Sequence, residues 1–334
     1  MFDRLYLVMR HGGLVVNRGA GGWSTTQILS ESSPECVAAD GRDPDRVFVG
    51  TFDDGLLRSS DGGSTFERVG ATTIEETAVM SVTMSPHDPD VVLAGTEPSA
   101  LYRSADGGDT WHRLTGFEDI PSADEWFFPP RPDTHHVRWV EVDPQDETRL
   151  YIGIEAGAFL LSPDGGQSWV DRPEGSMFDN HTLATHHDAP GRVYAAAGDG
   201  FACSNDGGAS WEHLEDGLQH GYVWGMAVDP GDADTVIASA ASGARTAHST
   251  PGEAYLYRLT DLEGTWQRLD DRGVPTGRGA LRAVLASGNA DGEFVAATDQ
   301  GLYHSTDSGA HWHDVPADWP ETFHGQTARG LVAV

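Results

Sequence analysis

The chain has 334 residues, of which 52 are acidic and 21 are basic, so its formal net charge is -31 at pH 7. Every basic residue in this count is an arginine, because the sequence contains no lysine. So negative a chain repels phosphate backbones and anionic lipid surfaces, which excludes nucleic-acid binding and electrostatic membrane binding from the expected functions. Dense carboxylates suit a protein that stays hydrated in concentrated salt, so we expect a cytoplasmic protein of a halophilic organism.

The chain opens on a short apolar run at residues 5–9, which predicts a β-strand rather than a secretory signal. No window is long and apolar enough to predict a membrane span. The last residues, 331–334, form a second short apolar run of the same kind. We expect these two runs to pair within one sheet.

Between these runs, an eight-residue phrase recurs with serine first, aspartate third, glycine fifth and an aromatic residue last, except that the phrase at 305–312 is less regular in its fourth and seventh positions. Five good copies lie at 59–66, 104–111, 162–169, 204–211 and 305–312, and two decayed copies lie at 17–23 and 260–266. Aspartate accepts turn N–H groups and glycine permits positive φ, so each copy predicts a tight turn between strands.

The aromatic residues that close these copies are spaced by 43, 45, 58, 42, 55 and 46 residues. This is the period of a four-stranded propeller blade. The anchors are Trp23, Phe66, Trp111, Trp169, Trp211, Trp266 and Trp312. They predict an all-β, seven-bladed β-propeller of four-stranded antiparallel blades, with six blades as the fallback, in a single domain over residues 1–334.

The phrase resembles the Asp-box, or BNR, repeat of sialidases, xyloglucanases, sortilin-like receptors and photosystem assembly factors. Residues 128–139 and 179–181 are also similar to uncharacterised prokaryotic BNR-like propellers labelled glycosyl hydrolase-like or sialidase-like. The resemblance implies that the repeat aspartates are structural and lie at the end of the propeller opposite the ligand site. These residues are Asp61, Asp106, Asp164, Asp206 and Asp307.

Aligning the repeats predicts which residues begin the innermost strands, where propellers bind ligands. The equivalent positions are Glu35, Met80, Arg138, His181, Trp224, Arg282 and Arg329. Two insertions are expected to cover this mouth, at about 116–136 and 239–254. In the first, Trp126, Phe127 and Phe128 are predicted to form a lid or wall, with Arg131, Asp133, His135 and His136 facing the ligand.

Histidines and a carboxylate from neighbouring loops form a candidate metal cluster. Neutral imidazoles with one carboxylate suit zinc, manganese or iron, although no local histidine spacing supports the assignment. The cluster comprises His136, Glu155, His181 and His220.

Three functions remain open on this evidence. One is a metal-assisted hydrolase or lyase acting on a small anionic or carbohydrate-derived substrate. Another is a glycoside hydrolase or sialidase-like enzyme, although the Arg-Ile-Pro motif of sialidases is absent. In such an enzyme a carboxylate would be bound by Arg138, Arg278, Arg282 and Arg329. The acid, base or nucleophile would be among Glu155, Asp179 and Tyr222. The third is a non-catalytic propeller that binds a protein or peptide. For all three, a monomer is sufficient.

Overall fold

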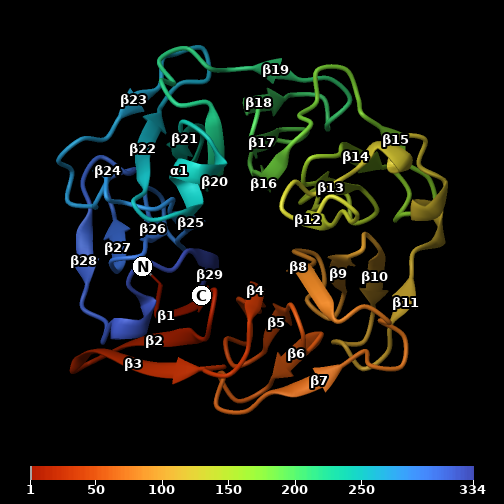
Figure 1. Ribbon diagram of the computed structural model, residues 1–334, viewed down its shortest axis with the longest axis horizontal. Helices are drawn as coiled ribbons and strands as arrows, with labels where there is room; N and C mark the ends of the chain where they lie inside the picture. Colours follow the sequence, from red (N-terminus) through yellow and green to blue (C-terminus); the bar gives the residue numbers. More distant parts are fainter. Residues whose placement is uncertain (1) are drawn as a thin grey trace.

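The computed structural model describes residues 2–334, which form seven antiparallel β-sheets arranged in a ring (Figure 1). Six sheets have four strands, and one has a fifth, two-residue strand, β24 (Gly277–Arg278), that pairs with β22. The predicted seven-bladed propeller is therefore confirmed. The short spacing between repeats dictates this form, because each repeat has room for only four short strands and their turns.

The strands of each blade run from the centre of the ring outward. The innermost strands are β29 (Ala328–Ala333), β4 (Pro34–Ala39), β8 (Ala78–Met84), β12 (Val137–Val142), β16 (Asn180–Thr185), β20 (Tyr222–Asp229) and β25 (Val284–Ser287). The second strands are β1 (Arg4–Met9), β5 (Val47–Thr51), β9 (Val92–Glu97), β13 (Leu150–Ile154), β17 (Val193–Ala197), β21 (Asp232–Ala241) and β26 (Phe294–Ala297). The third strands are β2 (Gly13–Gly19), β6 (Leu56–Ser59), β10 (Leu101–Ser104), β14 (Phe159–Ser162), β18 (Gly200–Ser204), β22 (Glu253–Leu259) and β27 (Leu302–Ser305). The outermost strands are β3 (Gly22–Ile28), β7 (Glu67–Val69), β11 (His112–Arg113), β15 (Val170–Asp171), β19 (Glu212–His213), β23 (Gln267–Arg268) and β28 (His313–Val315).

One blade combines both ends of the chain. Strand β29 pairs antiparallel with β1, with Leu5 opposite Ala333 and Leu7 opposite Leu331. The predicted closure is thus confirmed, and the chain ends meet in the same blade (Figure 1). The pairing leaves no open innermost edge between the first and last parts of the chain.

The repeated turns join the third and fourth strands and share one hydrogen-bond pattern. In the copy at 104–111, the Ser104 hydroxyl donates to Asp106 Oδ1 at 2.8 Å and accepts the Gly108 N–H at 2.9 Å. Thr110 donates its backbone N–H to Oδ1 and its hydroxyl to Oδ2 of Asp106. These hydrogen bonds lower the pKa of Asp106 to about 2. The same bonds recur around Asp61, Asp164 and Asp206. Around Asp307 the His311 ring takes the place of the threonine hydroxyl.

Aromatic rings fill the space between neighbouring blades. Trp211 packs edge-on against Phe159 of the preceding blade at 4.7 Å between ring centroids, and Trp266 packs against Phe201 at 5.0 Å. Cys36 and Cys203 are buried free thiols. Burial raises the pKa of each thiol to about 12.

The helices of the structure are short and lie in the connections. Residues 115–125 contain the 3₁₀ helices η1 (Thr115–Asp119) and η2 (Ala123–Glu125), and η3 (Glu321–Phe323) precedes β29. Helix α1 (Ala244–His248) lies between β21 and β22, inside the second predicted insertion. Among residues 2–334, no helix has the length and apolar character needed to span a membrane.

Candidate functional site

β-Bulges present one residue from nearly every blade at the mouth, the end of the ring where the chain enters the innermost strands. In six of these strands the pairing register shifts, and the extra residue is Glu35, Met80, Arg138, His181, Trp224 or Arg329. In the remaining blade, Arg282 lies two residues before β25. A bulge bends the strand and redirects its side chain. The repeat alignment predicted these same seven positions.

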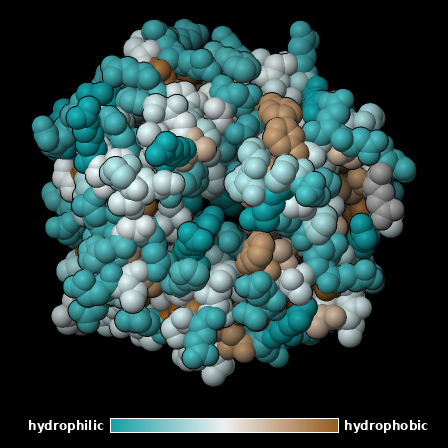
Figure 2. Space-filling view, viewed as in Figure 1, coloured by the Kyte–Doolittle hydropathy of each residue, from teal (hydrophilic) through white to brown (hydrophobic). Residues whose placement is uncertain are grey.

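The mouth opens into a cavity of about 270 Å³ on the ring axis. All seven innermost strands contribute to its wall, and Arg138, Trp224 and Arg329 line it from the mouth side. In the space-filling view the face is mostly hydrophilic, with a hollow near the centre (Figure 2). Three of the mouth residues therefore border a space of small-molecule size.

Three arginines in the mouth have guanidinium nitrogens without hydrogen-bond acceptors. Arg282 is fully buried; its Nη1 donates to the Ala328 carbonyl at 2.7 Å and its Nε donates to His248. Among the described residues, Arg282 Nη2 and the Nε atoms of Arg138 and Arg329 are buried without a hydrogen-bond partner. Each of these nitrogens is therefore available to an anionic ligand.

The arginines also crowd one another around a single indole ring. The guanidinium carbons of Arg282 and Arg138 lie 4.1 and 4.9 Å from the Trp224 ring centroid. Burial lowers the pKa of Arg282 well below its ordinary value, and the charges of Arg329 and Arg138 lower it further. The nearest ion pairs are loose: Arg138 to Glu155 at 3.8 Å and Arg329 to Glu35 at 3.4 Å. This part of the mouth has an excess of positive charge.

A chain of ion pairs runs along one side of the mouth to Glu155, which follows β13. His136 lies between two carboxylates, with Nε2 3.0 Å from Glu155 and Nδ1 3.3 Å from Glu97. Arg131 binds Glu97 through two hydrogen bonds of 2.7 and 2.6 Å. Burial acts to raise the pKa of Glu155, but His136, His181 and Arg138 outweigh it and lower that pKa to about 2. Glu155 is therefore ionised at neutral pH.

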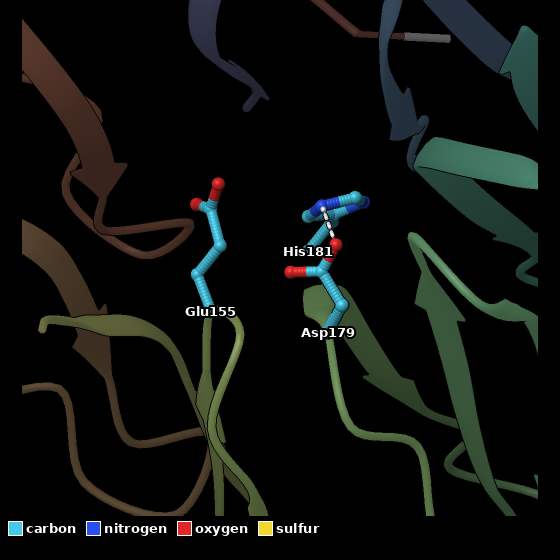
Figure 3. A group of neighbouring side chains, drawn as sticks. All are labelled: Glu155, Asp179 and His181. Atoms are coloured by element: carbon cyan, nitrogen blue, oxygen red, sulfur yellow. Dashed lines mark ion pairs between the residues drawn. The ribbon is translucent and has the colours of Figure 1, made fainter. Parts of the chain in front are cut away.

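Asp179 and His181 face Glu155 from the next blade (Figure 3). Asp179 Oδ1 accepts the Ala156 N–H at 2.9 Å, and Oδ2 lies 3.6 Å from His181 Nε2. The His181 ring is fully buried, and its Nδ1 lies 2.7 Å from the Val223 carbonyl oxygen. A carbonyl oxygen can only accept a hydrogen bond, so Nδ1 must carry a proton and donate it. In the neutral ring Nε2 is then the unprotonated nitrogen.

Tyr222, whose ring centroid lies 4.8 Å from that of His181, and His248 from α1 form the next part of the mouth. Arg282 donates to His248 Nδ1 at 3.2 Å, so the neutral imidazole carries its proton on Nε2, 3.0 Å from the Tyr222 hydroxyl oxygen. Burial and the charge of Arg282 lower the pKa of His248 to about 2, which keeps the ring neutral. Burial and the charges of Glu155 and Asp179 raise the pKa of Tyr222. Tyr222 thus keeps its proton, which is free to point into the mouth.

Several residues predicted to belong to the site lie elsewhere. His220 stacks on Tyr255 at 4.4 Å and contacts the Tyr257 hydroxyl, away from the other predicted metal ligands. The side chain of Arg278 is 91% exposed and lies 4.0 Å from Glu253. These positions depend on loop conformation, which the strand alignment does not determine.

The first insertion also differs from the predicted lid. Trp126 is buried in the core, donates to Ser122 and packs edge-on against His135, so neither ring lines the mouth. Phe128 packs on His136, and Phe127 is 39% exposed. Asp133 is exposed, and Arg131 reaches the mouth network only through Glu97. Trp126 therefore anchors the loop to the core instead of forming a pocket wall.

Glu97 lies outside the predicted set but belongs to the mouth network. Glu97 ends β9 at the position that Glu155 occupies after β13, and both follow a Gly-x pair, so the repeat alignment contained this signal. His248 of the second insertion was expected to cover the mouth, and it does reach Tyr222 and Arg282 there, from α1.

Comparisons with known proteins support the fold. No protein-family model and no curated protein matches the chain. The GH74 xyloglucanase from Xanthomonas campestris is similar with a TM-score of 0.67 at 17% identity, over 94% of this chain and 52% of that chain. An ancestral GH74 enzyme gives 0.63 at 16% identity, over 90% of this chain and 37% of its own. YCF48 from Cyanidioschyzon merolae gives 0.59 at 18% identity, over 86% of each chain.

The chain thus spans about half or less of these two GH74 enzymes and most of YCF48. At such identities the likeness establishes the seven-bladed propeller fold alone, since one fold supports many functions.

Proposed function

We propose that the mouth of this propeller is the substrate site of a hydrolase or lyase that acts on a small molecule carrying a carboxylate. The observation that carries the proposal is the set of buried guanidinium N–H groups without acceptors on Arg138, Arg282 and Arg329. Guanidinium groups bind carboxylates through paired, charge-assisted hydrogen bonds. A carboxylate bound here would satisfy these donors and offset the excess positive charge.

Groups suited to proton transfer lie beside these arginines: Glu155 is 3.8 Å from Arg138, and Tyr222 is linked to Arg282 through His248. Tyr222 retains a hydroxyl proton, whereas Glu155 is an ionised acceptor. The arginines would stabilise negative charge that develops next to the bound carboxylate, and the Tyr222 hydroxyl would donate a proton to a leaving group. Asp179 and Glu155 would accept a proton from substrate or water. This division of roles serves bond cleavage by hydrolysis or by elimination.

The shared hydrogen bonds of the repeated turns support placing the chain among the Asp-box propellers. Glycoside hydrolysis is less well supported by the mouth itself. A glycosidase acid needs a raised pKa, whereas that of Glu155 is lowered to about 2.

Peptide binding without catalysis is a second candidate, favoured by one observation. Phe127 and Phe178 are 39% and 41% exposed, and their ring centroids lie 6.4 Å apart. Phe178 directly precedes Asp179 of the mouth in the sequence. Such a pair could bind an apolar side chain beside a carboxylate held by the arginines. One similar structure is YCF48 bound to D1 peptide, with a TM-score of 0.58 at 17% identity.

Calorimetric titration with glucuronate and glucose tests the proposal, because the first sugar carries a carboxylate that the second lacks. We expect the protein to bind glucuronate and not glucose, and Arg282→Met to weaken glucuronate binding by about tenfold or more. Arg192→Met is the matched control, since Arg192 pairs with Asp234 on the surface. Equal binding of the two sugars, or no loss in Arg282→Met, would overturn carboxylate recognition.

A screen of uronates, esters and lactones for turnover then separates the two candidates. Cleavage that is lost in Tyr222→Phe supports the enzyme. Carboxylate binding with no turnover of any of these compounds supports the peptide-binding candidate.

A further inference from the structure

We infer that Glu155, Asp179 and His181 form a binding site for a divalent transition metal, zinc or manganese. The site lies in the mouth and extends the proposed function, but its evidence is separate from the arginines. It can therefore fail or succeed independently of carboxylate recognition.

The three side chains converge from two neighbouring blades. Glu155 follows β13, whereas Asp179 and His181 lie at the start of β16. One potential ligand atom from each residue lies within 4.8 Å of the other two. The close-up shows the two carboxylates and the imidazole facing a common space (Figure 3). Small side-chain movements would bring all three to coordination distance of one ion.

His181 supplies the observation that distinguishes this cluster from an ordinary group of acids. Its ring is fully buried, yet Nε2 has no hydrogen-bond partner among the described residues. That nitrogen lies 3.6 Å from Asp179 Oδ2, so it is directed into the cluster. A buried nitrogen without a partner is costly in the free protein, and a metal ion would satisfy it.

Neighbouring groups hold each ligand in the orientation that metal binding requires. His181 donates its Nδ1–H to the Val223 carbonyl, which fixes the tautomer with Nε2 unprotonated. The Ala156 N–H holds Asp179 Oδ1, and His136 holds Glu155 Oε2. Each carboxylate thus keeps one oxygen free of these contacts.

The donor set points to zinc or manganese. One imidazole nitrogen with two carboxylate oxygens is a mixed set that borderline metals accept, whereas magnesium and calcium prefer oxygen alone. Three protein ligands leave a coordination position open, as in catalytic rather than structural sites. Arg138 lies 3.8 Å from Glu155, so a substrate carboxylate could contact the arginine while another of its groups reached the ion.

This set replaces the one expected from the sequence. Both nitrogens of His136 face carboxylates, Glu155 at 3.0 Å and Glu97 at 3.3 Å. His220 contacts Tyr257 and Tyr255 instead. Asp179 is therefore the third proposed ligand instead of His136 or His220. Because His220 lies outside the proposed site, a substitution of His220 serves as the control for substitutions of the ligands.

The test is calorimetric titration of ZnCl₂ or MnCl₂ into tag-free protein that has been stripped with chelator. The variants are His181→Gln, Asp179→Asn and the control His220→Gln. Asp179→Asn keeps the shape of a partly exposed side chain and an oxygen for the Ala156 N–H, so it addresses the ligand role even if His181→Gln fails to fold. Circular dichroism verifies the fold of each variant.

We expect one ion per chain at the tight site of the wild type and of His220→Gln, and an affinity lower by about 100-fold in folded Asp179→Asn or His181→Gln. The same affinity in Asp179→Asn as in the wild type, or no stoichiometric binding of either metal to the wild type, would overturn the site. If glucuronate still binds in that second case, the proposed function survives without the metal.

Discussion

Replacing Arg282 with methionine is expected to stabilise the protein in the absence of ligand, although Arg282 is fully buried. No carboxylate forms an ion pair with its guanidinium among the described residues, and Nη2 has no hydrogen-bond partner. The charges of Arg329 and Arg138 oppose the charged form of Arg282 more strongly than the charge of Glu155 favours it. Arg282 is therefore a buried charge that is only partly compensated.

The expected change in the free energy of unfolding combines one stabilising effect of the substitution with two destabilising effects. An uncompensated buried charge costs about 3–5 kcal/mol. Its removal leaves the Ala328 carbonyl without its donor, at about 1–2 kcal/mol, and ends the contact with Trp224, worth about 1–2 kcal/mol. We expect a net stabilisation of about 1 kcal/mol, which is roughly 2 °C in Tm for a chain of this size.

Differential scanning calorimetry of both proteins, with and without saturating glucuronate, measures this effect. Ligand at about 100 times its Kd stabilises the wild type by about 2.7 kcal/mol and should have little effect on Arg282→Met, so the order of stability inverts. A variant that is less stable than the wild type by more than about 2 kcal/mol without ligand would refute the reasoning, because Arg282 would then be a structural residue.

Three further predictions concern the rest of the fold. Burial raises the pKa of Glu141 to about 7, so the stability of the protein should fall as the pH rises from 4.5 toward 7. In thermal melts, Glu141→Gln should therefore raise Tm at about pH 8 and leave Tm unchanged at about pH 4. Ser104→Ala removes the acceptor of the buried Gly108 N–H and should cost about 1–3 kcal/mol in urea denaturation, whereas the exposed Ser64→Ala should cost less than about 0.5 kcal/mol. The net charge of -31 predicts that Tm rises with KCl concentration, and a Tm that is flat or falls between about 0.1 and 2 M KCl would contradict the expected adaptation to salt.

The fold was predictable because its signals are local. Each repeated turn is complete within eight residues: the serine, aspartate and threonine of the 104–111 copy bond only to one another and to backbone between them. The spacing of these turns then leaves room for four short strands per blade. Even the blade that contains both ends of the chain followed from the strand-like apolar run at each end.

Only those residues of the candidate site that lie on the repeated strands were predictable from the sequence. Arg138, His181 and Trp224 occupy equivalent places because the bulge recurs at one register in each blade. Trp126 and His220 lie in loops whose conformations do not repeat, and their predicted roles at the mouth do not match the structure. Loop side chains are positioned by what they pack against, which alignment of repeats does not reveal.

The sequence by itself determined the number of blades, the turn chemistry and the residues that begin each innermost strand, because each depends on short-range periodicity. Only the tertiary structure decided which of these residues meet. Asp179 and His181 face Glu155 across a blade boundary, and His248 reaches Tyr222 from α1. These contacts join residues from different blades and connections, so their geometry arises from the closure of the ring and the packing of its loops.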